Sequence, residues 1–121
     1  MYGVPANLPV HRLIGNSFNF IGLGRFQIQL HASDLVAIYI EGKWELQDSE
    51  GTVVDSQNSY TERGATHLPT IIDVPVTACT IDAPRSFTLS FQSGHALIIY
   101  DDGPQFESFS VHFDGEPEIY V

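Results

Sequence analysis

Apolar and polar residues alternate with a period of two along most of the chain, which is typical of β-strands that bury one face. The alternation is clearest in the segments 25–30 (RFQIQL), 86–91 (SFTLSF) and 106–113 (FESFSVHF). The segment 35–40 (LVAIYI) is apolar at every position and predicts a strand that is covered on both faces. The chain is therefore expected to be rich in short strands.

Turn signals separate these segments about every ten residues. In the segment 48–51 (DSEG), Asp48 is suited to bond its own backbone and Gly51 to adopt a positive φ. The pairs Ser93-Gly94 and Asp114-Gly115 predict two-residue hairpin turns. The segment 117–121 (PEIYV) predicts a short edge strand because proline cannot donate to a β-ladder. The segment 22–25 (GLGR) is interpreted as a turn before a strand, since it lacks the glycine spacing of a dinucleotide site.

One short helix is expected in the segment 68–73 (LPTIID), with Pro69 in its first turn and Pro75 ending it. The predicted fold class is mainly β. We expect an antiparallel curved sheet, half-barrel or sandwich of about eight short strands with one short helix on it, as a single domain over residues 1–121. An α+β fold is the alternative if residues 57–74 are more helical. A hydrophobic fraction of 43% with only 17% charged residues indicates a globular chain.

Several classes of protein are disfavoured by the composition. No apolar run approaches the ~20 residues that span a bilayer, and the proline-broken start without basic residues does not predict a signal peptide. The single cysteine, Cys79, cannot form an internal disulfide and fits a reducing compartment. We therefore expect a protein of the cytoplasm.

The net charge of −10 is unevenly distributed. Residues 1–40 hold one acid against two arginines, whereas residues 41–121 hold fourteen acids against three cations. Nucleic acids and anionic membranes need the opposite sign. A basic protein is the partner that this charge would attract.

The sequence predicts no cofactor, no metal site and no catalytic residue. A metal site usually includes one close pair of ligands on one element, and no such spacing joins the five histidines to each other or to Cys79. No G-x-S-x-G segment is present, and Cys79 is expected to be a buried, unreactive thiol. The histidines are His11, His31, His67, His95 and His112.

The ending of the chain, ALIIYDDGPQFESFSV (96–111), resembles a family of small uncharacterised β-rich bacterial proteins. The segments HRLIG, FQIQL and WELQDSEG stand where that family has its opening strands. Some similar proteins are immunity proteins of contact-dependent growth inhibition toxins, and these share no fixed toxin-binding residues. Phe106 and Phe109 stand where the family more often has Tyr and Trp, which favours a structural role for the segment FESF.

The charge and the resemblance together predict a non-enzymatic immunity protein. It would cover the active site of a cognate toxin domain, a basic nuclease, with an acidic face that imitates phosphates. The sequence leaves open which acidic turns cluster, and the turn at Asp101 meeting the turn at Asp48 is one arrangement to test. The predicted partner-binding residues are Asp101, Asp102, Glu107, Asp114, Glu116 and Glu118, with Glu45, Asp48 and Glu50 as a competing patch.

Two other functions remain as alternatives. A small-ligand carrier would use the mouth of a half-barrel lined by Phe and Tyr, and a pocket of several hundred Å³ would favour it. A glycosidase would need two carboxylates about 5 Å or about 7–9 Å apart across a cleft. Asp101, Asp102 and Glu107 are the candidates for such a pair, although Asp-Asp-Gly-Pro is also an ordinary turn sequence.

Overall fold

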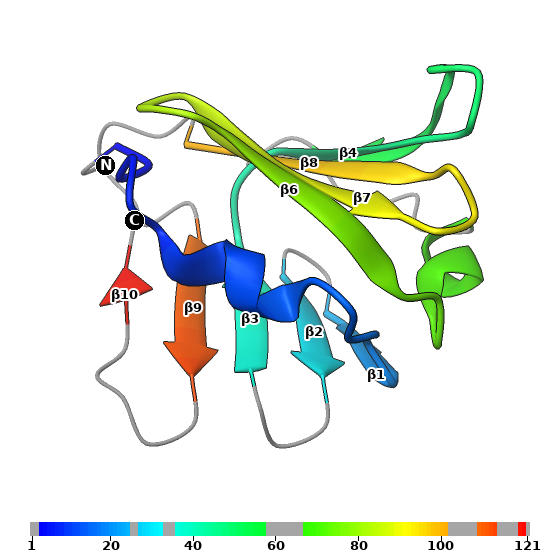
Figure 1. Ribbon diagram of the computed structural model, residues 1–121, viewed down its shortest axis with the longest axis horizontal. Coiled ribbons are helices and arrows are strands. Elements are labelled where there is room, and N and C mark those ends of the chain that lie inside the picture. Colours follow the sequence, from blue (N-terminus) through cyan, green and yellow to red (C-terminus); the bar gives the residue numbers. More distant parts are fainter. Residues whose placement is uncertain are drawn as a thin grey trace.

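The strands of alternating sequence form two antiparallel sheets of five strands each, stacked face to face (Figure 1). This computed structural model describes residues 3–24, 27–32, 36–57, 67–101, 109–113 and 119–120. The first sheet has the order β1 (Phe20–Leu23), β2 (Ile28–Ala32), β3 (Val36–Ile40), β9 (Phe109–Phe113) and β10 (Ile119–Tyr120). The second sheet has the order β5 (Val53–Gln57), β4 (Trp44–Gln47), β8 (Ala96–Tyr100), β7 (Ser86–Phe91) and β6 (Val76–Asp82).

The predicted mainly β class is confirmed, and of the expected architectures the sandwich is the one observed. Within the described residues neither sheet closes into a barrel. These residues form ten strands rather than about eight, partly because β1 includes residues for which the sequence predicts a turn. Gly22 belongs to β1 and leaves room for the ring of Phe20, since a Cβ at Gly22 would lie 3.3 Å from Phe20 Cε1.

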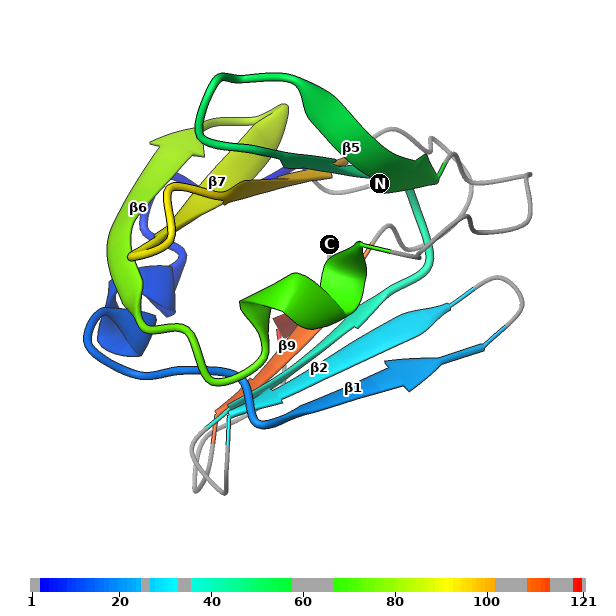
Figure 2. The same ribbon diagram turned by 90° about the vertical axis from the view of Figure 1, so that its right-hand side faces the viewer.

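The expected helix is a single 3₁₀ turn, η2 (Leu68–Ile71). A second 3₁₀ element that the sequence did not predict, η1 (Pro9–Leu13), precedes the first strand. Each carries proline near its start, where the fixed φ of proline suits a helical turn. The two elements lie along the margins of the sandwich between the sheets (Figure 2). In the described part of residues 57–74 no α-helix is present, so the α+β alternative gains no support.

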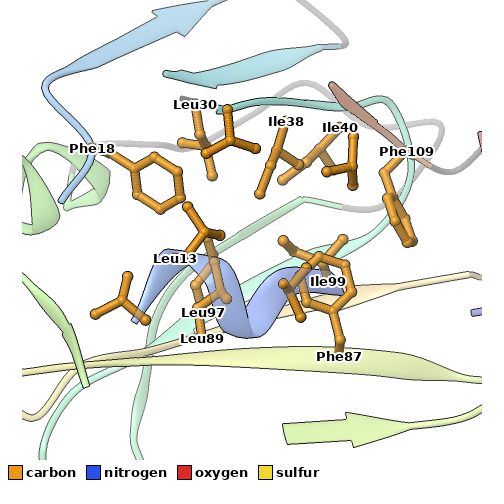
Figure 3. Close-up of a cluster of buried hydrophobic side chains, with 14 of the residues drawn as sticks. Leu13, Phe18, Leu30, Ile38, Ile40, Phe87, Leu89, Leu97, Ile99 and Phe109 are labelled. Atoms are coloured by element: carbon orange, nitrogen blue, oxygen red, sulfur yellow. The ribbon is translucent and has the colours of Figure 1, made fainter. Parts of the chain in front are cut away.

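The core lies between the sheets and is filled by side chains from their inner faces (Figure 3). Phe87 of β7 and Phe109 of β9 meet edge to face across the two sheets, with ring centroids 5.0 Å apart. Trp44 of β4 is fully buried, and its Nε1 donates to Oε1 of Gln57 on β5 at 3.1 Å. The predicted inward residues of β7 (Phe87, Leu89 and Phe91) and of β9 (Phe109, Val111 and Phe113) are all buried.

The expectation that β3 is covered on both faces is wrong. Val36, Ile38 and Ile40 are buried, but Ala37 and Tyr39 are half-buried on the outer face of the first sheet. β3 lies in the middle of its sheet, so these two side chains are flanked by β2 and β9 rather than covered by a further layer.

Candidate functional site

The nine carboxylates predicted to contact a partner fall into two groups. Asp102, Glu107, Asp114, Glu116 and Glu118 lie outside the described residues. Glu45, Asp48, Glu50 and Asp101 are described, and they occupy both ends of the second sheet.

Asp101 and Asp48 lie at opposite ends of the β4–β8 pair. Gln47, the residue before Asp48, is opposite Ala96 at the start of β8. At the other end Tyr100 donates its backbone N–H to the carbonyl of Lys43 at 3.0 Å. The two ends are about 16 Å apart along the strand, at ~3.3 Å per residue. The arrangement in which these two acidic turns meet is therefore wrong, because antiparallel strands place their following turns at opposite ends.

The Asp48 turn is held by its own side chain. Oδ1 of Asp48 accepts the backbone N–H groups of Glu50 at 2.9 Å and Thr52 at 3.0 Å. Gly51 has a φ of +81°, as the sequence predicted. The carboxylate of Asp48 is thus engaged in local structure, whereas Glu50 is exposed.

The other end, where the chain crosses from β3 to β4, gathers more charge. We call it the crossover end, and its described charged residues are Glu41, Lys43, Glu45, Asp82, Arg85 and Asp101. Register explains the gathering, because Tyr100 is opposite Ser86 on β7 and hydrogen-bonded to Lys43 before β4. The crossover end therefore contains four described carboxylates and two described cations. Arg85 and Asp82 form an ion pair, with Nη2 and Oδ1 2.6 Å apart.

A tyrosine links two of these strands on the outer face of the second sheet. The Tyr100 hydroxyl donates to Oε1 of Glu45 at 2.6 Å, and Nζ of Lys43 lies 4.7 Å from the centre of the Tyr100 ring. The hydrogen bond to Glu45 and partial burial raise the pKa of Tyr100 to about 12. Lys43 over the ring face is a favourable cation–π contact. Glu45 is thereby fixed with its charge at the surface.

Asp101 has a structural contact as well as a surface position. Its Oδ2 accepts the backbone N–H of Gly3 at 2.7 Å, and its own N–H donates to the carbonyl of Arg85 at 2.8 Å. The N-terminal segment is further held by Val4, whose N–H donates to the carbonyl of Pro84 at 2.9 Å. The hydrogen bond from Arg85 lowers the pKa of Asp82. Of the carboxylates that the sequence predicts to bind a partner, the structure therefore brings Glu45 and Asp101 together at the crossover end.

The described residues of the core are packed against one another in one cluster. A pocket of about 130 Å³ opens beside η1 and is lined by Arg12, Leu13, Asn16, Val36 and Phe113. It is smaller than the several hundred Å³ expected of a carrier. Among the described residues no group of three or more His, Cys, Asp or Glu is placed to share a metal ion.

A second surface, on the outer face of the first sheet, was missed by the sequence reasoning. Four rings follow one another across β1, β2, β3 and β9: Phe20, His31, Tyr39 and His112. From the sequence, His112 is interpreted only as a polar-face residue beside two serines. The alternation in 106–113 places His112 on an outer face, but the order of the strands, which makes His112 a neighbour of Tyr39, is not written in any local pattern.

No family model, curated protein or solved structure matches the chain. None of the helices that the structure describes has the length and apolar character needed to cross a membrane. The resemblance to immunity proteins therefore stays a prediction.

Proposed function

We propose that this protein is an immunity protein of the cytoplasm that binds a basic nuclease toxin domain and covers its active site, without catalysis of its own. The observation that carries the proposal is the crossover end, where Glu41, Glu45 and Asp101 lie on a molecule of net charge −10. In the sequence, the residues that follow Asp101, 102–108, include Asp102 and Glu107 and no lysine or arginine.

The physical argument is complementarity with a phosphate-binding groove. A nuclease needs cationic side chains to hold nucleic acid, and carboxylates presented at one end of a rigid sandwich are suited to occupy the same cations. Complementary charge speeds association, and buried charge pairs slow dissociation. The bond from Tyr100 holds Glu45 in place before binding, so less side-chain entropy is lost in the complex.

The filled core also favours a function at the outer surface. The inner faces of both sheets belong to one cluster of buried hydrophobic residues. A carrier of apolar ligands would need that space empty. The described structure therefore supports the inhibitor over the carrier.

The test is binding to a panel of purified basic nuclease toxin domains at several salt concentrations. For a domain that binds, the double variant Glu41→Gln/Glu45→Gln should lower the association rate and flatten its salt dependence. The Glu45→Gln change keeps an oxygen for the Tyr100 hydroxyl, so the fold should be unaffected. The matched control is Glu50→Gln, an exposed carboxylate at the opposite end of the sheet, which should bind like the parent. The proposal would be contradicted by an affinity that does not change with salt concentration. It would also be contradicted if Glu50→Gln lowered the association rate as much as the double variant does.

A further inference from the structure

The outer face of the first sheet carries one ring on each of four adjacent strands. Phe20 of β1 and His31 of β2 have ring centres 5.5 Å apart, and the centre of Tyr39 on β3 is 5.8 Å from that of His31. His112 on β9 follows at 4.6 Å from Tyr39. We call these four side chains the aromatic row. At a strand spacing of about 4.8 Å the row is about 14 Å long.

Small residues make the row continuous. The register places Ala37 opposite both His31 and His112. A single methyl at this position leaves the Tyr39 ring room to contact both imidazoles. Gly22 has the same role at the edge, where the Phe20 ring lies against it. Phe20 is 57% exposed although it is a large apolar residue, so the row ends in a ring that is open to solvent.

A chain of hydrogen bonds runs from His31 along β2, across the direction of the row. Gln27 donates from Nε2 to Oε1 of Glu41 at 2.9 Å, and Gln29 donates from Nε2 to Oε1 of Gln27 at 3.1 Å. His31 Nε2 lies 3.3 Å from Oε1 of Gln29. Because the ionised Glu41 only accepts, it fixes the orientation of both amides, and His31 must donate from Nε2.

The polar groups of this face are thus oriented before any ligand arrives. The second imidazole is held too, because Nε2 of His112 lies 3.0 Å from Oγ of Ser110. If the His31 ring is neutral, its Nδ1 is an acceptor, while the Tyr39 hydroxyl both donates and accepts. Groups that are already ordered lose less entropy when a ligand binds.

The charge of the face limits what it can bind. The outward residues of β1, β2, β3 and β9 between the rings are glutamine, serine, alanine and glycine, without a carboxylate, ammonium or guanidinium group. Anions are repelled by a molecule of net charge −10, and the described outward residues of these four strands offer a cation no carboxylate. In Figure 2 the strands of this sheet have the second sheet and η2 on one side and no described element on the other.

We propose that the aromatic row is a binding site for a neutral oligosaccharide. Sugar rings have apolar faces that lie against aromatic rings, and their hydroxyls exchange hydrogen bonds with amides, imidazoles and tyrosine. An uncharged ligand also matches the uncharged outward side chains between the rings, and its extended shape matches a row of four rings. Aromatic side chains with a polar tip are suited to such mixed contacts. The site is separate from the carboxylates that are proposed to bind the toxin. The exception is Glu41, which also accepts the first hydrogen bond of the glutamine chain.

The experiment is a titration of the full chain, followed by backbone amide NMR, with four neutral hexasaccharides: maltohexaose, cellohexaose, laminarihexaose and chitohexaose. At least one should bind and shift the amides of β1, β2, β3 and β9. Phe20→Ala and Tyr39→Ala should each weaken that binding by about tenfold, the loss expected for one stacked ring. Thr88→Ala, on the outer face of the second sheet, is the control and should leave binding unchanged.

Four outcomes would overturn the proposal. One is the absence of binding by all four sugars at millimolar concentration. A second is binding that Phe20→Ala and Tyr39→Ala leave intact. A third is tighter binding of an anionic sugar such as a hexamer of galacturonic acid. The last is a dimer in sedimentation that Phe20→Ala dissociates, since the row would then contact a second copy. None of these results depends on a toxin, so this test and that of the immunity function fail separately.

Discussion

The hydroxyl of Tyr100 donates a 2.6 Å hydrogen bond to Glu45, a residue 55 positions earlier in the chain. The bond joins β8 to β4 on the outer face of the second sheet, at the end where the chain passes between sheets. It fixes a carboxylate of the proposed interface with a neutral partner rather than a cation. The charge of Glu45 therefore remains available to a basic ligand.

This bond predicts how stability depends on alkaline pH. Tyr100 has a pKa of about 12 in the folded protein, against about 10 in an unfolded chain. The folded state keeps the phenol proton of Tyr100 to a higher pH than the unfolded chain does. The contribution of this hydrogen bond to stability is therefore fully present below about pH 10 and is lost as the pH rises through about 12. In Tyr100→Phe this alkaline loss should be smaller, as measured by urea unfolding at a series of pH values. Glu45→Gln should lower the pKa of Tyr100 in an NMR titration, and an unchanged value would contradict the assignment.

The first turn of η2 is capped by a residue that is distant in the sequence, Asp55. Substitution of Asp55 should therefore lower the stability of the protein. Oδ2 of Asp55 on β5 accepts the backbone N–H groups of His67 at 3.0 Å and Leu68 at 3.2 Å, and η2 has no cap from its own side chains. Asp55→Ala would leave a buried N–H without an acceptor and should cost about 1–3 kcal/mol. Asp55→Asn keeps an oxygen and should cost less.

The measurement for Asp55 is urea unfolding followed by the fluorescence of Trp44, the one tryptophan of the chain. Trp44 is fully buried, so its emission should change on unfolding. Ser56→Ala, at an exposed neighbouring position on β5, is the control and should change stability by less than about 0.5 kcal/mol. Equal losses in Asp55→Ala and Ser56→Ala would show that the cap contributes nothing.

The contact between Phe87 and Phe109 predicts a large loss of stability. Phe109 is 1% exposed and its ring meets Phe87 edge to face. Phe109→Ala should cost about 3–5 kcal/mol, and Phe109→Leu less because it fills more of the space. Phe20→Ala removes the same side chain from an exposed site and is the matched control. Similar unfolding midpoints for Phe109→Ala and Phe20→Ala would contradict the assignment of Phe109 to the core.

Cys79 is expected to react slowly with thiol reagents. It is half-buried on β6, its Sγ donates to the carbonyl of Val10 at 3.2 Å, and burial raises its pKa. Since the thiolate is the reactive form, alkylation at neutral pH should be slower than for a free cysteine. The rate should recover in urea, and a rate in the native protein equal to that in urea would contradict this.

Local patterns were sufficient to predict the buried faces of β2, β7 and β9. The alternation in 86–91 gave the buried set Phe87, Leu89 and Phe91 because a strand turns each successive side chain to the opposite face. The Asp48 turn was predictable for the same local reason, since its bonds stay within four residues. β3 misled the analysis because a short apolar run does not show whether one face or both will be covered.

Partners that lie far apart in the chain were decided only by the tertiary structure. β3 pairs with β9, so Tyr39 and His112 became neighbours although all five strands of the second sheet lie between them in the sequence. The cap that Asp55 gives to η2 and the separation of Asp48 from Asp101 have the same origin. Within the segments of clear alternation, the sequence alone determined which side chains would leave water, because burial there follows the period of the strand. It did not determine which strands would lie side by side, because that choice minimises the free energy of the whole packed core.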